Sequence, residues 1–142
     1  MPAPFTLSIL AADHPFYEGE CLSLVIPTTE GQYGIMANHS NMIAGIVPGI
    51  LTAVLGGKEP GERVVAAVTA GIAKVEKNKV LILVDSIERP EEIDLKRAER
   101  EYEAAMKALK KKAGEIEHSL AEAKLMRAVN RLRAKKNYGG GS

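Results

Sequence analysis

The side chains that most often carry out chemistry are few in this 142-residue sequence and lie far apart. The three histidines, His14, His39 and His118, have no partner at the spacing of metal ligands, so we expect no metal site. Lys58 follows a glycine, but Glu59 stands where a phosphate-binding loop needs serine or threonine. The serines lack the sequence context of a hydrolase nucleophile. We therefore expect a protein that is not an enzyme and requires no cofactor.

The composition is typical of a small globular chain with an aliphatic core. Hydrophobic residues make up 46% of the sequence, with only two Phe, four Tyr and no Trp. No apolar run is long enough to span a bilayer, and no secretion signal opens the chain. The single cysteine, Cys21, cannot form an internal disulfide and is expected to be a small apolar residue in a strand. A reducing, cytosol-facing compartment is the expected setting.

The C-terminal third of the sequence, residues 90–136, has the period of two amphipathic helices with a weak break at 110–114. Asp94 is the expected N-cap, because its carboxylate can accept hydrogen bonds from N–H groups of the first turn. Each helix has one narrow, alanine-rich apolar stripe, so the helices can pack on each other or on another partner. The stripes hold Leu95, Ala98, Tyr102, Ala105, Met106 and Leu109, then Ile116, Leu120, Ala123, Ala128 and Leu132.

The first part of the sequence predicts short strands separated by glycine and proline turns. Residues 5–10 alternate apolar and polar, the period of a half-buried strand, and residues 76–79 are a candidate hairpin turn. A short piece at 16–17 and a strand at 21–26, ended by Pro27, follow, and residues 29–34 have turn chemistry. Further strands are expected over 35–36, 42–47, 50–55, 64–70, 72–75 and 80–84.

The predicted fold class is an all-β sandwich, or flattened antiparallel barrel, followed by a C-terminal α-helical hairpin. We expect residues 1–87 to form the sandwich and residues 88–138 the two-helix domain. Residues 139–142, Gly-Gly-Gly-Ser, have the composition of a flexible linker.

Charge is nearly balanced overall but is divided unevenly along the chain. The net charge is +1, yet residues 1–89 carry six basic and nine acidic residues, and residues 90–138 carry thirteen and nine. From Lys124 onward there are six basic residues and no acid. A basic tail suits nucleic acid, an acidic membrane or an acidic protein surface, or it is a solvated helix end. Because no aromatic residues interleave with these charges, nucleic acid is not an expected partner.

Two stretches resemble the ε subunit of the bacterial F-type rotary ATP synthase. One is GQYGIMANHSNM at residues 31–42, although the family more often has Leu-Pro-Gly where this chain has Met-Ala-Asn at 36–38. The other is IDLKRA at residues 93–98, at the strand-to-helix boundary, with a hairpin containing Gly71 between the two. The resemblance extends from Phe5 to about Lys136. It implies a ten-stranded N-terminal β-sandwich and a C-terminal helical hairpin.

The resemblance also implies a rotor-stalk subunit of a proton- or sodium-driven synthase. In that family the sandwich binds the γ subunit and rests on the membrane c-ring. The helices fold down on the sandwich, or extend along γ toward the catalytic α/β hexamer and block ATP hydrolysis. The implied location is peripheral, on the cytoplasmic face of the bacterial cell membrane. The implied partner-binding residues are Gly31, Gly34, Ile35, Met36, His39 and Met42 on the sandwich and Lys124, Arg133, Lys135 and Lys136 on the second helix.

Some members of the family bind ATP as a regulatory ligand in the folded-down form. Arg127 and Arg131 are four residues apart, so both guanidinium groups would lie on one helix face and could share a polyphosphate. The departure is Ala104, where nucleotide-binding members have a further arginine; Arg100 or Lys107 would have to replace it. The ATP-binding residues that the resemblance implies are Glu88, Ile93, Asp94, Arg97, Ala98, Arg127 and Arg131.

Two alternatives remain open at this point. Asp94 as a helix cap needs no ligand, and the two arginines of the second helix could instead pair with Glu99 or Glu103 within the hairpin. The chain could also be a free-standing ATP-sensing module of the same fold.

Overall fold

The computed structural model describes residues 3–57, 61–111 and 114–138. The chain divides into two compact units, which we call the sandwich unit (residues 1–88) and the helical unit (residues 89–142). Among the described residues, no helix is both long enough and apolar enough to cross a membrane.

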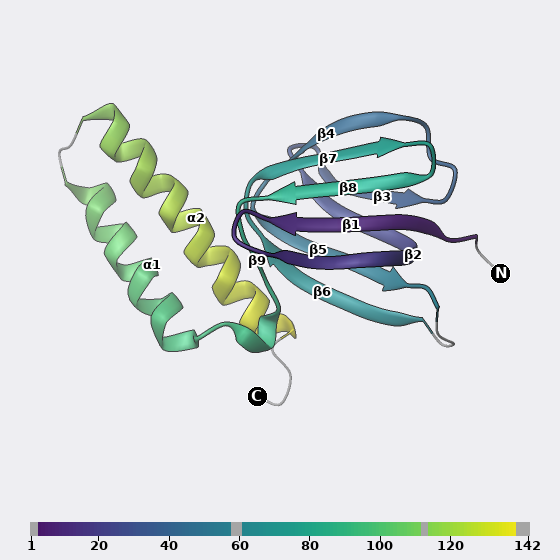
Figure 1. The fold of residues 1–142 in the computed structure, drawn as a ribbon. Coiled ribbons are helices and arrows are strands. Elements are labelled where there is room, and N and C mark those ends of the chain that lie inside the picture. Colours follow the sequence, from purple (N-terminus) through teal and green to yellow (C-terminus); the bar gives the residue numbers. More distant parts are fainter. Residues whose placement is uncertain (1–2, 58–60, 112–113, 139–142) are drawn as a thin grey trace. The chain divides into compact units, whose positions relative to one another are not determined.

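The described part of the sandwich unit forms nine strands in one continuous sheet that folds over on itself (Figure 1). The strand order is β4-β7-β8-β1-β2-β5-β6-β9, with β3 paired to β2, and all pairs are antiparallel except β1 with β8. This confirms the predicted all-β sandwich. The bounds are β1 Phe5–Ala11, β2 Pro15–Thr28, β3 Gly31–Met36, β4 Met42–Ile46, β5 Gly49–Leu55, β6 Glu62–Val68, β7 Gly71–Glu76, β8 Lys79–Val84 and β9 Ile87–Glu88.

The long strand β2 connects the two layers of the sandwich. Its first half pairs with β1, with Tyr17 opposite Ile9, and its second half pairs with both β5 and β3. The prediction of two separate pieces, the second ended by Pro27, is therefore wrong. Pro27 lacks an N–H, but its carbonyl oxygen accepts a hydrogen bond from Val47 N at 3.1 Å, and β2 continues to Thr28.

The turn expected over residues 29–34 is shorter than predicted. Only Thr29 and Glu30 turn, and strand β3 already begins at Gly31. The hydroxyl of Thr28 stabilises this tight turn, because it donates to Gly31 O at 2.7 Å and accepts from Glu30 N at 3.3 Å. The other predicted hairpin is confirmed: β7 and β8 are joined by Lys77 and Asn78, whose φ angles of 50° and 61° are those of a tight two-residue turn.

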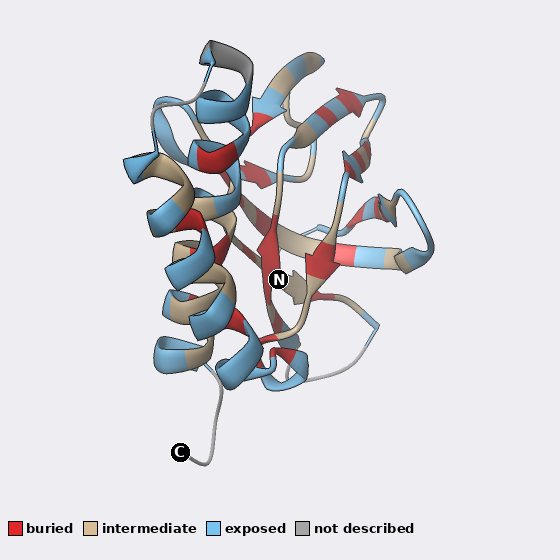
Figure 2. Cartoon of the chain, turned by 90° about the vertical axis from the view of Figure 1, so that its left-hand side faces the viewer, coloured by how far each residue is buried: buried red, intermediate tan, exposed pale blue. Residues whose placement is uncertain are grey.

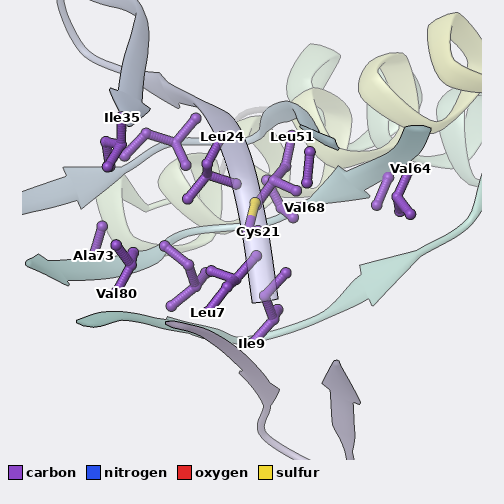
Figure 3. Packing of buried hydrophobic residues seen from close by; sticks show 14 of the residues in the cluster. Leu7, Ile9, Cys21, Leu24, Ile35, Leu51, Val64, Val68, Ala73 and Val80 are labelled. Carbon is purple, nitrogen blue, oxygen red and sulfur yellow. The ribbon is translucent and has the colours of Figure 1, made fainter. Parts of the chain in front are cut away.

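The core of the sandwich is aliphatic, as the composition indicates (Figure 3). Alternate residues of each strand point inward, for example Phe5, Leu7 and Ile9 on β1. Cys21 lies fully buried among them, where burial raises the pKa of its thiol to about 11. The thiol therefore stays protonated at neutral pH and belongs to the core, as the sequence predicts.

The helical unit consists of a short 3₁₀ turn η1 (Pro90–Glu92) and two antiparallel helices, α1 (Leu95–Lys110) and α2 (Glu115–Tyr138) (Figure 1). Asp94 is the N-cap of α1, and its Oδ1 accepts from Arg97 N at 3.2 Å, which confirms the predicted cap. Lys111 and Gly114 lie outside the helices, in agreement with the predicted break; residues 112–113 lie outside the described residues.

Among the helix residues whose burial is described, the buried ones are all alanines, and Figure 2 shows buried positions on both helices. Ala98 and Ala105 on α1 and Ala128 on α2 agree with the predicted stripes. Leu95, Leu120 and Ala123, also predicted there, are exposed instead, and Ala121 and Ala134 are buried. In α2 the larger apolar residues surround the helix, so spacing alone does not select its inner face. Ala121 and Ala128 are buried and Ala123 is not, so residue size alone does not select the inner face either.

Candidate partner-binding surface and arginine cluster

The loop of residues 37–41, which joins β3 to β4, holds His39 in one orientation. His39 Nδ1 lies 2.8 Å from the carbonyl oxygen of Ser40, and Nε2 lies 2.8 Å from the hydroxyl of Tyr33. Because a carbonyl oxygen can only accept, Nδ1 carries the proton and Nε2 accepts from Tyr33. The two rings meet edge to face, with centroids 5.6 Å apart. The imidazole is thus oriented by partners on both sides.

The same loop is fastened to the β7–β8 turn by two asparagine side chains. Asn38 N donates to Asn78 Oδ1 at 2.8 Å, and Lys77 N donates to Asn41 Oδ1 at 3.2 Å. Asn78 Nδ2 also donates to Pro4 O at 3.2 Å. The sequence does not reveal this role, because an asparagine in a hairpin turn indicates only the turn. The loop is therefore held by the β7–β8 turn as well as by β3 and β4, and that turn is itself bonded to Pro4.

The sandwich residues expected to bind a partner differ in exposure. Gly31 and Gly34 are exposed on β3, and Met36 at its end is 56% exposed. Ile35, between Gly34 and Met36, is 0% exposed and belongs to the core, so its side chain does not lie on the surface of the free chain. Strand alternation explains this, because neighbouring residues point to opposite faces. Met42 is half-buried and packs against the core.

Four neighbouring strands carry an exposed set of large aliphatic side chains, which we call the outer apolar face. Ile72 on β7 lies opposite Leu83 on β8, which lies opposite Leu10 on β1. On β4, Gly45 is the partner of Ile72. Ile43 lies two residues before Gly45, so its side chain points to the same side of the sheet, and it is 72% exposed. Figure 1 shows these four strands side by side. This exposed apolar set is therefore a candidate surface for binding a partner.

The outer apolar face was not predicted, although the sequence contains a signal for it. Residues 80–84 of β8 are apolar at every position, rather than alternating. When a sandwich strand is apolar at every position, its inner side packs in the core and its outer side also presents apolar side chains. Such an outer side is expected to be covered by another surface.

Arg97 on α1 and Arg131 on α2 meet at one carboxylate of the helical unit. Together with Arg127, one turn before Arg131, we call them the arginine cluster. Arg97 Nε donates to Glu101 Oε1 at 3.2 Å, and Arg131 Nη1 donates to Glu101 Oε2 at 2.7 Å. The side chain of Arg131 is 16% exposed, while those of Glu101 and Arg97 are 43% and 68% exposed. One carboxylate therefore contacts guanidinium groups of both helices. Glu99 and Glu103 were the acids considered for Arg131, whereas the acid that meets it is Glu101.

The remaining residues that the resemblance implies in ATP binding differ in burial and in the element that carries them. Arg127 is half-buried on α2, one turn before Arg131 and on the same face. The carboxylate of Asp94 already caps α1, and Ile93 and Ala98 are buried. Glu88 lies in β9 of the sandwich unit, opposite Ala67. On α1, Ala104, Arg100 and Lys107 are exposed.

The basic residues expected to meet a partner lie along about the last four turns of α2. Lys124, Arg133 and Lys136 are exposed and Lys135 is half-buried. Lys135 and Lys136 stand in the last turn, where cations also offset the negative end of the helix dipole.

Solved structures of two other proteins have the same fold. A chain of the Euglena gracilis mitochondrial ATP synthase superposes with a TM-score of 0.79 and 24% identity, over 94% of this chain and 82% of that one. A chain of the Tetrahymena thermophila mitochondrial ATP synthase central stalk and c-ring gives a TM-score of 0.71 and 12% identity, over 94% and 98%. At these identities the likeness concerns the fold alone.

The sequence itself matches two family models and a set of curated relatives. The model of the ATP synthase Delta/Epsilon chain β-sandwich domain matches residues 4–90, and that of the long α-helix domain matches residues 91–136. ATP synthase epsilon chains from Clostridium novyi and Ruminiclostridium cellulolyticum are 40% and 35% identical over 132 residues, 93% of this chain and 98% and 96% of theirs. That of Thermosynechococcus vestitus is 32% identical over 136 residues, 96% of this chain and 95% of its own. Since these matches cover both units, the chain belongs to the epsilon-chain family of the F-type ATP synthase.

Proposed function

We propose that this chain is a non-catalytic central-stalk subunit that binds γ and the membrane c-ring through its sandwich unit and restrains ATP hydrolysis through its helical unit. The observation that carries the proposal is the outer apolar face, with Ile43, Ile72, Leu83 and Leu10 exposed in one group on a rigid sheet. Membership of the epsilon-chain family supports γ as the partner that covers it. The chain would then act peripherally, on the cytoplasmic face of the bacterial membrane.

The helical unit has properties that suit a regulatory element. The fully buried side chains described on its helices are alanines, and each buried methyl contributes only about 0.8 kcal/mol, while larger apolar side chains such as Met106 and Leu132 are only half-buried. The helices can therefore exchange each other for another surface at a modest cost in free energy. In an extended form, the basic residues from Lys124 onward would face the catalytic α/β hexamer, where an acidic surface would complement them.

Ending the chain after Glu88 is expected to raise ATP hydrolysis by the reconstituted complex several-fold without releasing the sandwich from γ. The sandwich unit keeps its own core in this variant, and the helices that would restrain hydrolysis are gone. The measurements are ATPase rate and co-purification with γ, with urea unfolding as the control for the fold. Unchanged hydrolysis would remove the inhibitory role, and loss of γ from a folded sandwich would remove the stalk role.

We further propose ATP as a regulatory ligand of the arginine cluster. In support, Arg127 and Arg131 share one face of α2, and Arg97 meets the same carboxylate as Arg131 from α1. Three guanidinium groups from two helices match the charge of a polyphosphate. At ten times its dissociation constant, ATP would stabilise the folded hairpin by about 1.4 kcal/mol.

Calorimetric titration of the full chain with ATP is expected to give a binding isotherm in the millimolar range or below. Arg127→Gln should weaken that binding about tenfold, because it removes one phosphate ligand. Lys96→Gln, at an exposed basic residue of α1, is the control and should change it less than twofold. The absence of heat at millimolar ATP would refute ATP binding. ATP binding by a chain that never co-purifies with γ would instead favour a free-standing sensor.

A further inference from the structure

The carboxylate of Glu101 forms a polar link between α1 and α2. Its two oxygens bind different partners, Oε1 to Arg97 of the same helix and Oε2 to Arg131 of the other helix. The 2.7 Å bond to Arg131 is short and charge-assisted, and the Arg131 side chain is largely removed from water. Such a pair is screened less than one between fully exposed side chains.

The two hydrogen bonds of Glu101 depend differently on the shape of the helical unit. Arg97 and Glu101 are four residues apart on one helix, so their contact needs only α1. Arg131 is thirty residues from Glu101 and meets it only when α1 and α2 lie side by side. Arg97 therefore orients the carboxylate in either shape, and Arg131 receives it only in the folded hairpin.

The apolar contacts of the hairpin leave its larger side chains only partly covered. The fully buried side chains described on its helices are alanines, including Ala98 and Ala105 on α1 and Ala121 and Ala128 on α2, whereas Met106 and Leu132 are half-buried. Because this apolar surface is incompletely removed from water, a partly buried ion pair can contribute to the balance between folded and extended forms.

We propose that Glu101 is an internal anionic lock, which occupies the arginine cluster and keeps the hairpin folded when no ligand is bound. The carboxylate takes the position on Arg97 and Arg131 that an anionic ligand would otherwise take. The folded hairpin is then the resting form of the free chain, and an anion that binds the cluster replaces Glu101 rather than creating the fold. Only this last step rests on the proposed binding of ATP.

Energy transfer between two dyes on the full chain measures the lock directly. Exposed Lys96 and Asn137, each replaced by cysteine in a Cys21→Ala background, place the dyes near the start of α1 and the end of α2. These positions are close together in the antiparallel hairpin and about 60 Å apart in one continuous helix. Without ATP, the otherwise unaltered chain is expected to be mostly folded.

Glu101→Gln keeps the side-chain shape and removes the charge. It is expected to raise the ratio of extended to folded molecules about tenfold, equivalent to about 1.4 kcal/mol. Glu103→Gln removes the same charge from an exposed position of the same helix and should change the ratio less than twofold. In an Arg131→Gln background, Glu101→Gln should have no further effect, because the pair is already broken. Equal ratios for Glu101→Gln and Glu103→Gln would overturn the lock, as would a chain that is extended without ATP.

Adding ATP to Glu101→Gln separates the lock from the nucleotide site. If the triphosphate replaces the lost carboxylate, ATP should return this variant to the folded form. If Glu101→Gln opens and ATP does not refold it, the lock stands and the proposed ATP site fails. Circular dichroism checks that both glutamine variants keep the helical content of the original chain.

Discussion

Replacing Gly71 with alanine is expected to lower the free energy of unfolding of the sandwich unit by at least about 3 kcal/mol. Gly71 opens β7 between β4 and β8, opposite Ile46 on one side and Val84 on the other. A Cβ at this position would overlap the carbonyl oxygen of Leu83 and lie 2.8 Å from Cα of Val84. Both neighbours are backbone atoms, so no side chain can move aside, and the β7–β8 pairing must open. A loss of this size is a large fraction of the stability of a small domain.

Gly45→Ala is the matched control for Gly71→Ala. Gly45 lies in the adjacent strand β4, and an added Cβ there meets nothing within 4 Å. Alanine should therefore leave the free energy of unfolding within about 1 kcal/mol of its original value. Urea unfolding followed by circular dichroism gives both values. Equal stabilities of the two variants would show that the strands β7 and β8 separate at Gly71 without loss.

Ile43→Asp is expected to weaken binding to γ about 100-fold while leaving the sandwich folded. The Ile43 side chain is 72% exposed and lies outside the core, so aspartate is well solvated in the free chain. In a complex that covers the outer apolar face, the same carboxylate would lose its water without gaining a partner. A 100-fold loss of affinity is about 2.8 kcal/mol, which lies within the range above 2 kcal/mol found for central residues of an interface.

Calorimetry with purified γ measures the effect of Ile43→Asp. Ile72→Asp on the neighbouring strand should act in the same direction. Arg63→Asp introduces an aspartate at an exposed position of β6, away from the outer apolar face, and should change the affinity less than threefold. If Ile43→Asp binds γ as tightly as Arg63→Asp does, the outer apolar face is not the γ-binding surface. Another face of the sandwich would then have to bind γ.

Local patterns predicted much of the fold correctly, because they depend on residues close together in the sequence. Alternation over residues 5–10 identified β1, and the turn at Lys77 and Asn78 was recognised from its neighbours. Asp94 was identified as a cap because a helix start leaves N–H groups that only such a side chain can satisfy. The acid that meets Arg131 is Glu101 rather than Glu99 or Glu103, since spacing gives a helix face but not the register between two helices.

The order of strands and helices, the capping residue and the aliphatic core were determined by the sequence alone, through the periods of two and 3.6 residues. The tertiary structure decided which residues from distant segments meet. It buried Ile35 within a predicted contact stretch, aligned Ile72, Leu83 and Leu10 across three strands, and set Glu101 against Arg131. These outcomes depend on the register between strands and between helices. That register results from packing of the whole unit, so no short stretch of sequence contains it.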